Sequence, residues 1–189
     1  KNLLGLNAQE KYAIKQTMSS KNSIKEIANN IRDVQDFPKE GIVFKDITPI
    51  LSDINLFRKS IDLMVKPFIE KKIDVVVGIE SRGFIFGTPI ADRLNASFVP
   101  VRKPGKLPHE TEQISYQLEY GKDSLEIHKD SINEGQKILI VDDLLATGGT
   151  AEATCKLITK LKGNILGLAV LVELEFLEGR KKLNPYNVH

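Results

Sequence analysis

The residues best suited to chemistry lie in one stretch, residues 138–151, where two adjacent acids precede a glycine-rich turn. The acids are Asp142 and Asp143, and the turn consists of Ala146, Thr147, Gly148, Gly149 and Thr150. Glycines permit positive φ angles and let several backbone N–H groups converge on one anion, while the threonines add hydroxyl donors. The helical pattern that follows would add the partial positive charge of a helix N-terminus, so the turn predicts a phosphate site.

Two carboxylates beside this turn would repel a ligand that was phosphate alone. They are explained if the ligand also carries hydroxyl groups or a divalent cation, so we expect a sugar phosphate with a vicinal diol. Its hydroxyls would contact Asp142 and Asp143, and its phosphate would contact the turn. The turn has neither the Gly-Lys-Ser/Thr of a Walker motif nor the Gly-x-Gly-x-x-Gly of a Rossmann fingerprint, which excludes those two explanations.

Other cations follow other apolar runs. Arg82 lies three residues after the run at residues 73–79, and the turn-rich segment after residue 101 carries Arg102, Lys103 and Lys106. Guanidinium and ammonium groups at strand ends suit a ligand that is rich in phosphate. The residue types alone leave open a plainer alternative, in which this segment is a solvated basic turn.

Alternating apolar runs and helical patterns indicate the elements that would position these residues. Mainly apolar runs at residues 73–79, 98–101, 138–141 and 165–172 predict strands that are buried in a parallel sheet, with the acids where their strand ends. Helical patterns cover residues 84–94 and the stretch from the turn to Lys162. Residues 114–120 and 124–127 are expected to form an antiparallel ribbon. The expected fold is α/β, with a central, mainly parallel sheet flanked by helices.

Composition narrows the class of protein. We interpret residues 18–189 as a single domain and residues 1–17 as an extension of unknown role. A net charge of +2 gives no electrostatic case for binding nucleic acid or membranes, and no apolar run approaches the length of a membrane span. The single cysteine, Cys155, excludes an internal disulfide framework and fits a reducing cytoplasm; we interpret it as a small core residue.

The acids and the turn resemble the phosphoribosyl pyrophosphate motif of the type I phosphoribosyltransferases. Further stretches narrow the resemblance to the adenine phosphoribosyltransferase family and extend it over about Ile24 to Tyr186. These stretches are Asp36-Phe-Pro with Gly41-Ile-Val-Phe-Lys-Asp-Ile-Thr-Pro, Glu80-Ser-Arg-Gly-Phe-Ile-Phe-Gly, Arg102-Lys-Pro-Gly-Lys-Leu-Pro, and Leu118-Glu-Tyr-Gly with Leu125-Glu-Ile-His-Lys-Asp. The segment before Met18 is foreign to the family's pattern.

The resemblance implies the type I phosphoribosyltransferase fold, with a flexible antiparallel lid and an N-terminal hood segment. It implies a pentosyltransferase of purine salvage, which transfers the 5-phosphoribosyl group from phosphoribosyl pyrophosphate to adenine and gives AMP and pyrophosphate. Magnesium would be held mainly by the pyrophosphate oxygens of the substrate and by water, with no protein cage. A homodimer in the cytoplasm is also expected.

The same resemblance assigns tasks to residues. Phe44 and Leu144 would sandwich the adenine ring, whose polar edge would contact the backbone of Val43 and Lys45. Asp142 and Asp143 would bind the ribose hydroxyls, and residues 146–150 the 5′-phosphate. The residues expected to bind pyrophosphate are Ser81, Arg82, Arg102, Lys103, Lys106 and Tyr120, with Arg102 also placed to reach the site of a partner subunit.

Glu119 would be the catalytic general acid and base at N7 of the purine. From residue type alone, Phe44 is better explained as a core residue, and Glu119 as an exposed carboxylate of the ribbon. We interpret His109 and His128 as surface residues.

Two other functions compete with the adenine enzyme. One is a phosphoribosyltransferase for another base, such as hypoxanthine, guanine or orotate; the segment around Phe44 and the Leu-Glu-Tyr-Gly ribbon argue against it. The other is a regulator that senses phosphoribosyl pyrophosphate and binds nucleic acid. Residues 1–30 are too short for a winged-helix module, and the charge is balanced.

Overall fold

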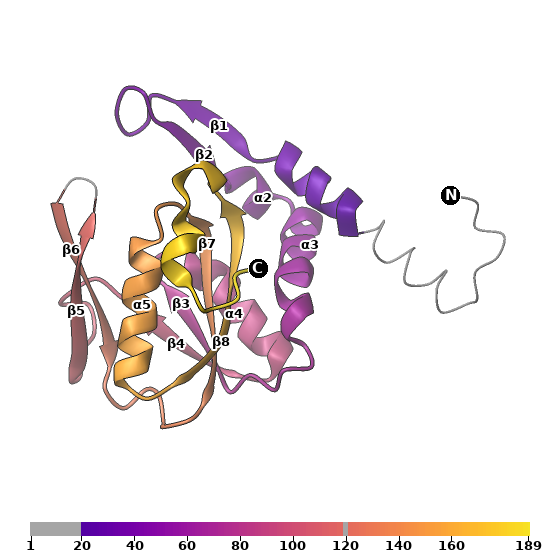
Figure 1. The fold of residues 1–189 in the computed structure, drawn as a ribbon. Helices are drawn as coiled ribbons and strands as arrows, with labels where there is room; N and C mark the ends of the chain where they lie inside the picture. Colours follow the sequence, from indigo (N-terminus) through magenta and orange to yellow (C-terminus); the bar gives the residue numbers. More distant parts are fainter. Residues whose placement is uncertain (1–19, 119–120) are drawn as a thin grey trace, which may run out of the picture. The chain divides into compact units, whose positions relative to one another are not determined.

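The computed structural model describes residues 20–118 and 121–189 (Figure 1). The chain consists of two compact units, with the boundary between Leu63 and Met64, and each unit is described by itself. The expected extension at residues 1–17 lies outside the described residues. The assignment of residues 18–189 to one domain stays a prediction.

The first unit combines short helices with an antiparallel strand pair. Residues 20–29 are helical, β1 (Arg32–Gln35) pairs with β2 (Val43–Asp46), and α2 (Thr48–Ser52) and most of α3 (Ile54–Val65) follow. The carboxylate of Asp53 caps α3, because it accepts hydrogen bonds from the backbone N–H groups of Asn55 and Leu56 at 2.8 and 3.1 Å. Phe44 lies on β2, and its ring meets that of Phe37 edge-on with 5.2 Å between the centroids.

The second unit is built on a four-stranded parallel sheet with the order β4-β3-β7-β8 (Figure 1). Its strands are β3 (Val75–Ile79), β4 (Ser97–Val101), β7 (Lys137–Leu145) and β8 (Asn164–Glu173), and its helices are α4 (Gly83–Leu94) and α5 (Gly149–Lys160). β5 (Thr111–Leu118) and β6 (Gly121–His128) form a separate antiparallel ribbon. The prediction of a parallel α/β sheet with an antiparallel strand pair is confirmed; that the ribbon moves stays a prediction.

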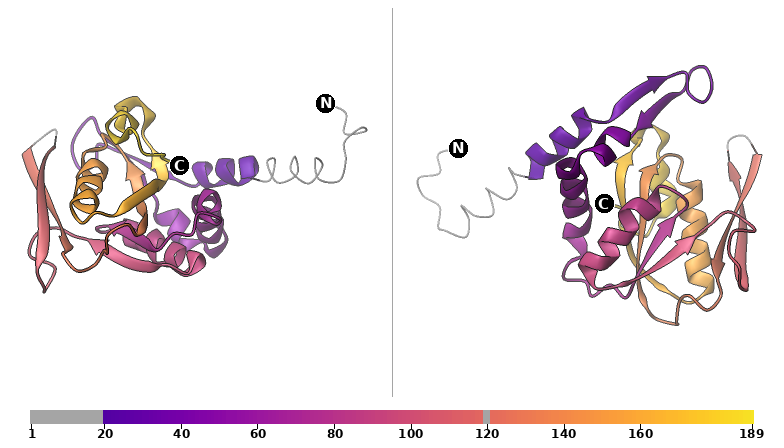
Figure 2. Two further views of the ribbon diagram at one scale, coloured as in Figure 1. Left: turned by 60° about the horizontal axis from the view of Figure 1, so that its bottom comes forward. Right: turned by 180° about the vertical axis from the view of Figure 1, so that it is seen from behind.

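The order of the strands determines where a ligand can bind. From the two central strands the chain turns in opposite directions, because β3 leads through α4 to β4 and β7 leads through α5 to β8. Right-handed crossovers then put α4 and α5 on opposite faces of the sheet (Figure 2). The crevice beyond the carboxyl ends of β3 and β7 is the switch point at which open α/β sheets bind ligands.

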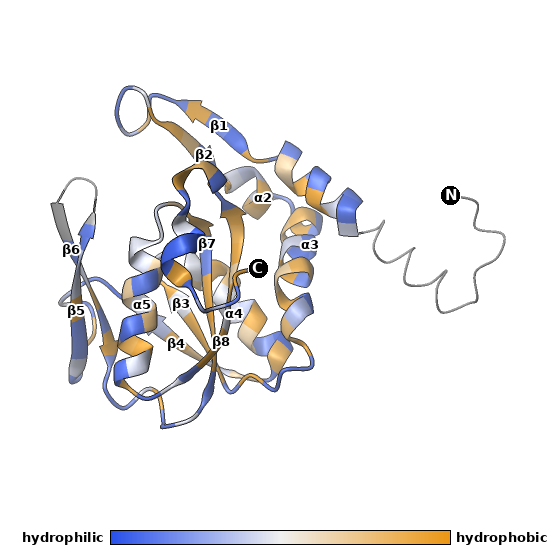
Figure 3. Cartoon of the chain, viewed as in Figure 1, coloured by the Kyte–Doolittle hydropathy of each residue, from blue (hydrophilic) through white to orange (hydrophobic). Residues whose placement is uncertain are grey.

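Successive side chains of a strand point to opposite faces of the sheet, and the core is packed on both faces. The central strands are mainly apolar (Figure 3), and Val77 and Ile140 pack in one buried cluster with Leu157 and Ile158 of α5. On the other face, the glycine at position 78 makes room for aromatic rings: a Cβ atom there would lie 2.7 Å from the ring of Phe98. Within the described residues, no helix is both long and apolar enough to cross a bilayer.

One expectation about the end of an element was wrong. β7 does not end before the acids but runs on to Leu145, because Asp142 and Leu144 still pair with Val170 and Val172 of β8. The residues after β8 are also ordered into elements. They form two 3₁₀ helices, Glu175–Leu177 and Gly179–Leu183, and return to the sheet through a bridge between Leu168 and Val188.

Candidate active site

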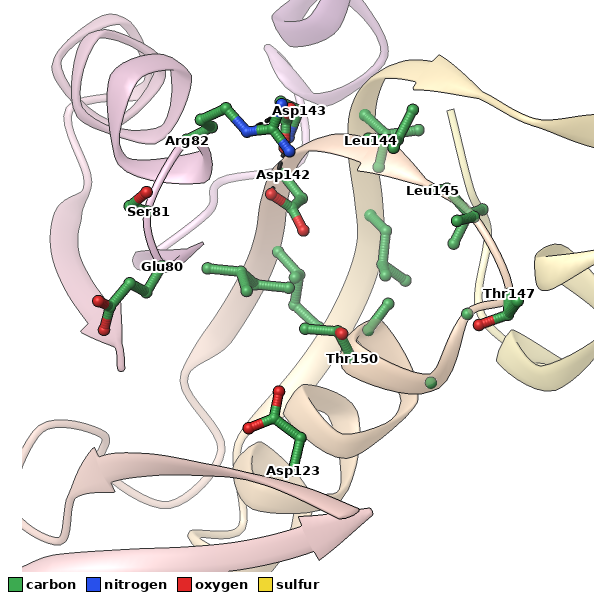
Figure 4. Close-up of a pocket in the computed structure, with 18 of the residues that line it drawn as sticks. Glu80, Ser81, Arg82, Asp123, Asp142, Asp143, Leu144, Leu145, Thr147 and Thr150 are labelled. Atoms are coloured by element: carbon green, nitrogen blue, oxygen red, sulfur yellow. Dashed lines mark hydrogen bonds and ion pairs between the residues drawn. The ribbon is translucent and has the colours of Figure 1, made fainter. Parts of the chain in front are cut away.

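A cavity of about 390 Å³ lies at the switch point, beyond the carboxyl ends of β3 and β7 (Figure 4). It brings together the turn after β3, the segment after β4, the ribbon, and the turn between β7 and α5. Many of the residues expected to bind phosphoribosyl pyrophosphate and adenine thereby line the same cavity. They are Ser81, Arg82, Lys103, Asp142, Asp143, Leu144, Ala146, Thr147, Gly148, Gly149 and Thr150.

The two acids of β7 face different surroundings, because side chains alternate between the faces of a strand. Asp142 points into the cavity, whereas the side chain of Asp143 points toward Arg82 (Figure 4). There its Oδ2 lies 3.1 Å from Nε of Arg82, the N-cap residue of α4, and the side chain is only 6% exposed. The structure thus offers one carboxylate to a ligand and binds the other to a cation.

The pKa of Asp142 is raised well above its ordinary value. Burial is the main cause, and the negative charge of Asp143 is the next. The backbone N–H of Asp143 donates a hydrogen bond of 2.8 Å to Oδ1 of Asp142, which acts in the opposite direction. A ligand that donates hydroxyl hydrogens would stabilise the charged form of this carboxylate.

The glycine-rich turn is shaped by its backbone. Gly148 has a φ of 80°, the left-handed conformation that glycine adopts without strain, and Gly149 begins α5. The C-terminal segment supports the turn from behind: a Cβ atom on Gly148 would collide with the carbonyl of Gly179, and one on Gly179 with the carbonyl of Ala146. Only glycine at both positions allows this contact.

The cationic segment after β4 is held by Glu80, the residue that directly follows β3. Its Oε2 accepts a 2.8 Å hydrogen bond from the backbone N–H of Lys103 and lies 3.3 Å from Nε of Arg102, while its Oε1 pairs with the ammonium group of Lys106. Burial alone would raise the pKa of Glu80, but Lys106, the Lys103 backbone and Arg102 together hold it below its ordinary value. Arg102 and Lys106 therefore lie against Glu80, and Lys103 is the member of this segment that lines the cavity.

The ribbon reaches the cavity with Tyr116 and Asp123. The Tyr116 hydroxyl lies 3.2 Å from Oγ1 of Thr150 in the turn and 3.2 Å from Oδ2 of Asp123. Asp123 also pairs with the ammonium group of Lys103. Glu119 and Tyr120 lie outside the described residues, so their predicted roles stay predictions.

The remaining predicted residues are distributed as follows. Val43, Phe44 and Lys45 lie on β2 of the first unit, where Lys45 pairs with Asp33 at 2.6 Å, and their contact with adenine stays a prediction. Cys155 is buried in α5, as expected of a core residue, and burial raises the pKa of its thiol to about 12. In residues 20–118 and 121–189, no group of three or more His, Cys, Asp and Glu side chains could hold a metal ion.

Four residues at the site escaped the sequence analysis. Glu80 had a usable signal, because an acid directly after a buried strand lies at the edge of the sheet where ligands bind. Tyr116 and Asp123 are ordinary residues for an exposed ribbon, and Gly179 belongs to a segment without a recognisable pattern. Their roles arise from contacts between segments that are far apart in the sequence.

Comparison with known proteins gives a consistent result. The family model of the phosphoribosyl transferase domain matches residues 46–188. The adenine phosphoribosyltransferase of Christiangramia forsetii is 57% identical over 163 residues, which cover 86% of this chain and 95% of that protein. The crystal structure of the enzyme from Thermoanaerobacter pseudethanolicus has a TM-score of 0.85 at 54% identity and covers 88% of this chain and 96% of its own.

A yeast structure extends this comparison to a liganded protein. The adenine phosphoribosyltransferase of Saccharomyces cerevisiae, complexed with an imino-altritol bisphosphate and adenine, has a TM-score of 0.84 at 44% identity. The match covers 89% of this chain and 97% of the yeast chain.

Proposed function

The chain belongs to the adenine phosphoribosyltransferase family, and from this premise we propose how its residues divide the work of the reaction. The enzyme transfers the 5-phosphoribosyl group from phosphoribosyl pyrophosphate to adenine and releases AMP and pyrophosphate, a reaction of purine salvage. The observation that supports the assignment best is the cavity at the switch point, where the glycine-rich turn, Asp142 and Lys103 meet.

The glycine-rich turn binds the 5′-phosphate, and the acids bind the ribose. Backbone N–H groups of residues 146–150 and the hydroxyls of Thr147 and Thr150 surround the phosphate. Asp142 accepts hydrogen bonds from the ribose hydroxyls, and these hydrogen bonds offset the cost of its buried charge. Asp143 borders the same cavity and contributes while it holds Arg82.

Pyrophosphate leaves C1′ with growing negative charge, and cations at the opposite end of the cavity stabilise it. Arg82 and Lys103 line the cavity and contact pyrophosphate directly, together with Ser81. Arg102, Lys106 and Tyr120 complete this set. Lys106 moves from Glu80 to the ligand, and Arg102 moves from Glu80 to the ligand or to the site of a partner subunit.

Magnesium accompanies the pyrophosphate group. The donors present suit this ion, because Asp142 and Asp143 are hard oxygen ligands that border the cavity, and Mg²⁺ prefers substrate phosphates, water and one or two carboxylates. When bound, the ion would neutralise charge on the pyrophosphate group.

Adenine lies in line with the C1′–pyrophosphate bond, between Phe44 and Leu144, with the backbone of Val43 and Lys45 at its polar edge. N9 forms the new bond to C1′ as the bond to pyrophosphate breaks. Glu119 exchanges a proton with N7, whose basicity changes during the reaction. Leu144 supports this arrangement, since it lines the cavity beside Asp142.

We also propose a homodimer in the cytoplasm. The single cysteine, which can form no disulfide within the chain, suits a reducing compartment. Sedimentation of a fully active monomer at micromolar concentration would contradict the dimer.

The base specificity is tested by one coupled assay with adenine, hypoxanthine, guanine and orotate, each supplied with phosphoribosyl pyrophosphate and Mg²⁺. We expect turnover of adenine and essentially none of the other three bases. Equal turnover of hypoxanthine would refute the adenine pocket.

A further inference from the structure

Asp123 extends from the ribbon into the cavity (Figure 4) and forms an ion pair with Lys103 there. Its Oδ2 lies 3.2 Å from the Tyr116 hydroxyl, which in turn lies 3.2 Å from Oγ1 of Thr150. The carboxylate therefore lies between Lys103, which is proposed to bind pyrophosphate, and the glycine-rich turn, which is proposed to bind the 5′-phosphate. A carboxylate in such a position stands where the anionic groups of the substrate must pass or bind.

We propose that Asp123 and pyrophosphate exchange on the ammonium group of Lys103. The carboxylate of Asp123 binds this ammonium group when pyrophosphate is absent, and it competes with pyrophosphate for the ammonium group when pyrophosphate is present. The proposal rests on the proposed function, in which Lys103 binds pyrophosphate. Asp123 is then a positioning residue that lowers the affinity for pyrophosphate and speeds its release.

The charges of the pair fit this exchange. Burial would raise the pKa of Asp123 and lower that of Lys103, but their contact holds Asp123 below and Lys103 above the ordinary values. Both groups are therefore charged at neutral pH. Pyrophosphate carries more negative charge than one carboxylate, so bound pyrophosphate displaces Asp123 from the ammonium group of Lys103. The carboxylate of Asp123 then repels the bound pyrophosphate.

Lysine suits the exchange better than arginine would. Its ammonium group is a compact charge with three donors on a flexible stem, so it can turn from one acceptor to another without a fixed geometry. The side chains of Lys103 and Asp123 are 39% and 24% exposed, which leaves room for this rotation and keeps the pair moderate in strength.

The same ribbon contains a matched control. Glu112 on β5 pairs with Lys160 of α5 at 2.7 Å, and the two side chains are 50% exposed for Lys160 and 30% for Glu112. This pair also joins the ribbon to the body of the unit, but neither residue lines the cavity. A variant at Glu112 therefore reports on the attachment of the ribbon without competition for pyrophosphate.

The test is calorimetric titration of inorganic pyrophosphate, with excess Mg²⁺, into the protein and its Asp123→Asn and Glu112→Gln variants. Asparagine keeps the shape and the acceptor for Tyr116 but removes the charge. We expect Asp123→Asn to bind pyrophosphate about threefold to tenfold more tightly and to release it more slowly by a similar factor, with Glu112→Gln unchanged. A purely structural role would give the opposite sign, because loss of a supporting contact weakens binding.

Unchanged or weaker binding by Asp123→Asn, with a normal thermal unfolding transition, would overturn the exchange, and so would equal tightening by Glu112→Gln. Lys103→Met separates this outcome from failure of the proposed function. It should weaken pyrophosphate binding and abolish the effect of Asp123→Asn in the double variant. Full affinity in Lys103→Met alone would instead remove Lys103 from the pyrophosphate site.

Discussion

Arg82 and Asp143 join the two halves of the site: Nε of Arg82, at the start of α4, lies 3.1 Å from Oδ2 of Asp143, near the end of β7. The contact crosses the switch point between the two central strands, from which the chain turns in opposite directions. It fixes a cation at the edge of the cavity and neutralises one of two adjacent acids. Asp142 is left as the carboxylate that points into the cavity.

The ribose assignment predicts a selective loss in the double variant Asp142→Asn with Asp143→Asn. AMP and phosphoribosyl pyrophosphate should bind more weakly, since each charge-assisted hydrogen bond that is lost costs about 1.5–3 kcal/mol. Free adenine, which has no diol, should bind as before. Calorimetric titration with AMP measures this, and unchanged affinity for AMP would contradict the role of the acids.

Asp142→Asn alone should stabilise the ligand-free protein at neutral pH. Burial, followed by the charge of Asp143, raises the pKa of Asp142, so the folded state keeps its proton to a higher pH than the unfolded state. Stability is therefore lost as the pH rises from the ordinary value of 3.8 through the raised pKa. Thermal unfolding should show that the variant's advantage grows from acidic to neutral pH; an equal or lower melting temperature at neutral pH would argue against the buried charge.

Glu119 is tested by two replacements that differ in one property. Glu119→Leu cannot exchange a proton, and we expect it to lower kcat by about 10²–10⁴ with little change in the binding of phosphoribosyl pyrophosphate. Glu119→Gln keeps the shape and can donate from its amide, so it should retain more activity. If Glu119→Leu turns over adenine at the parent rate in single-turnover experiments, Glu119 has no catalytic role.

Gly179→Ala should damage the phosphate site from outside it. The new methyl group would collide with the carbonyl of Ala146, and the turn would have to shift. We expect weaker binding of AMP with little change for adenine alone. Lys182→Ala, an exposed change in the same 3₁₀ helix, is the control and should bind AMP normally. Equal AMP affinity in both variants would show that the turn does not depend on this support.

Much of the fold was predictable from local pattern. The buried strands around Val77, Ile140 and Ala169 could be recognised, since each is an apolar run followed or preceded by a helical pattern. The end of β7 was misjudged because Asp142 reads as a strand terminator, whereas pairing with Val170 of β8 continues past it. Tertiary pairing overrode the local signal.

The site was predictable only where the sequence itself places residues together. Asp142 and the glycine-rich turn are neighbours in the chain, so their shared ligand could be inferred. Glu80 and Arg102 are 22 residues apart, and Tyr116 and Thr150 are 34 apart. Contacts of this kind depend on how separate strands and loops meet, which residue types do not specify.

The alternation of Asp142 and Asp143 along β7 limits how this region can change in evolution. Substitutions are open to gradual selection, but a one-residue insertion or deletion just before Asp142 would turn each acid to the other's face. The side chain that pairs with Arg82 would then enter the cavity, and the one that binds the ligand would turn toward Arg82. An insertion of two residues would restore the faces, so length variation in β7 should be even-numbered, whereas the loop at residues 129–136 is free of this constraint.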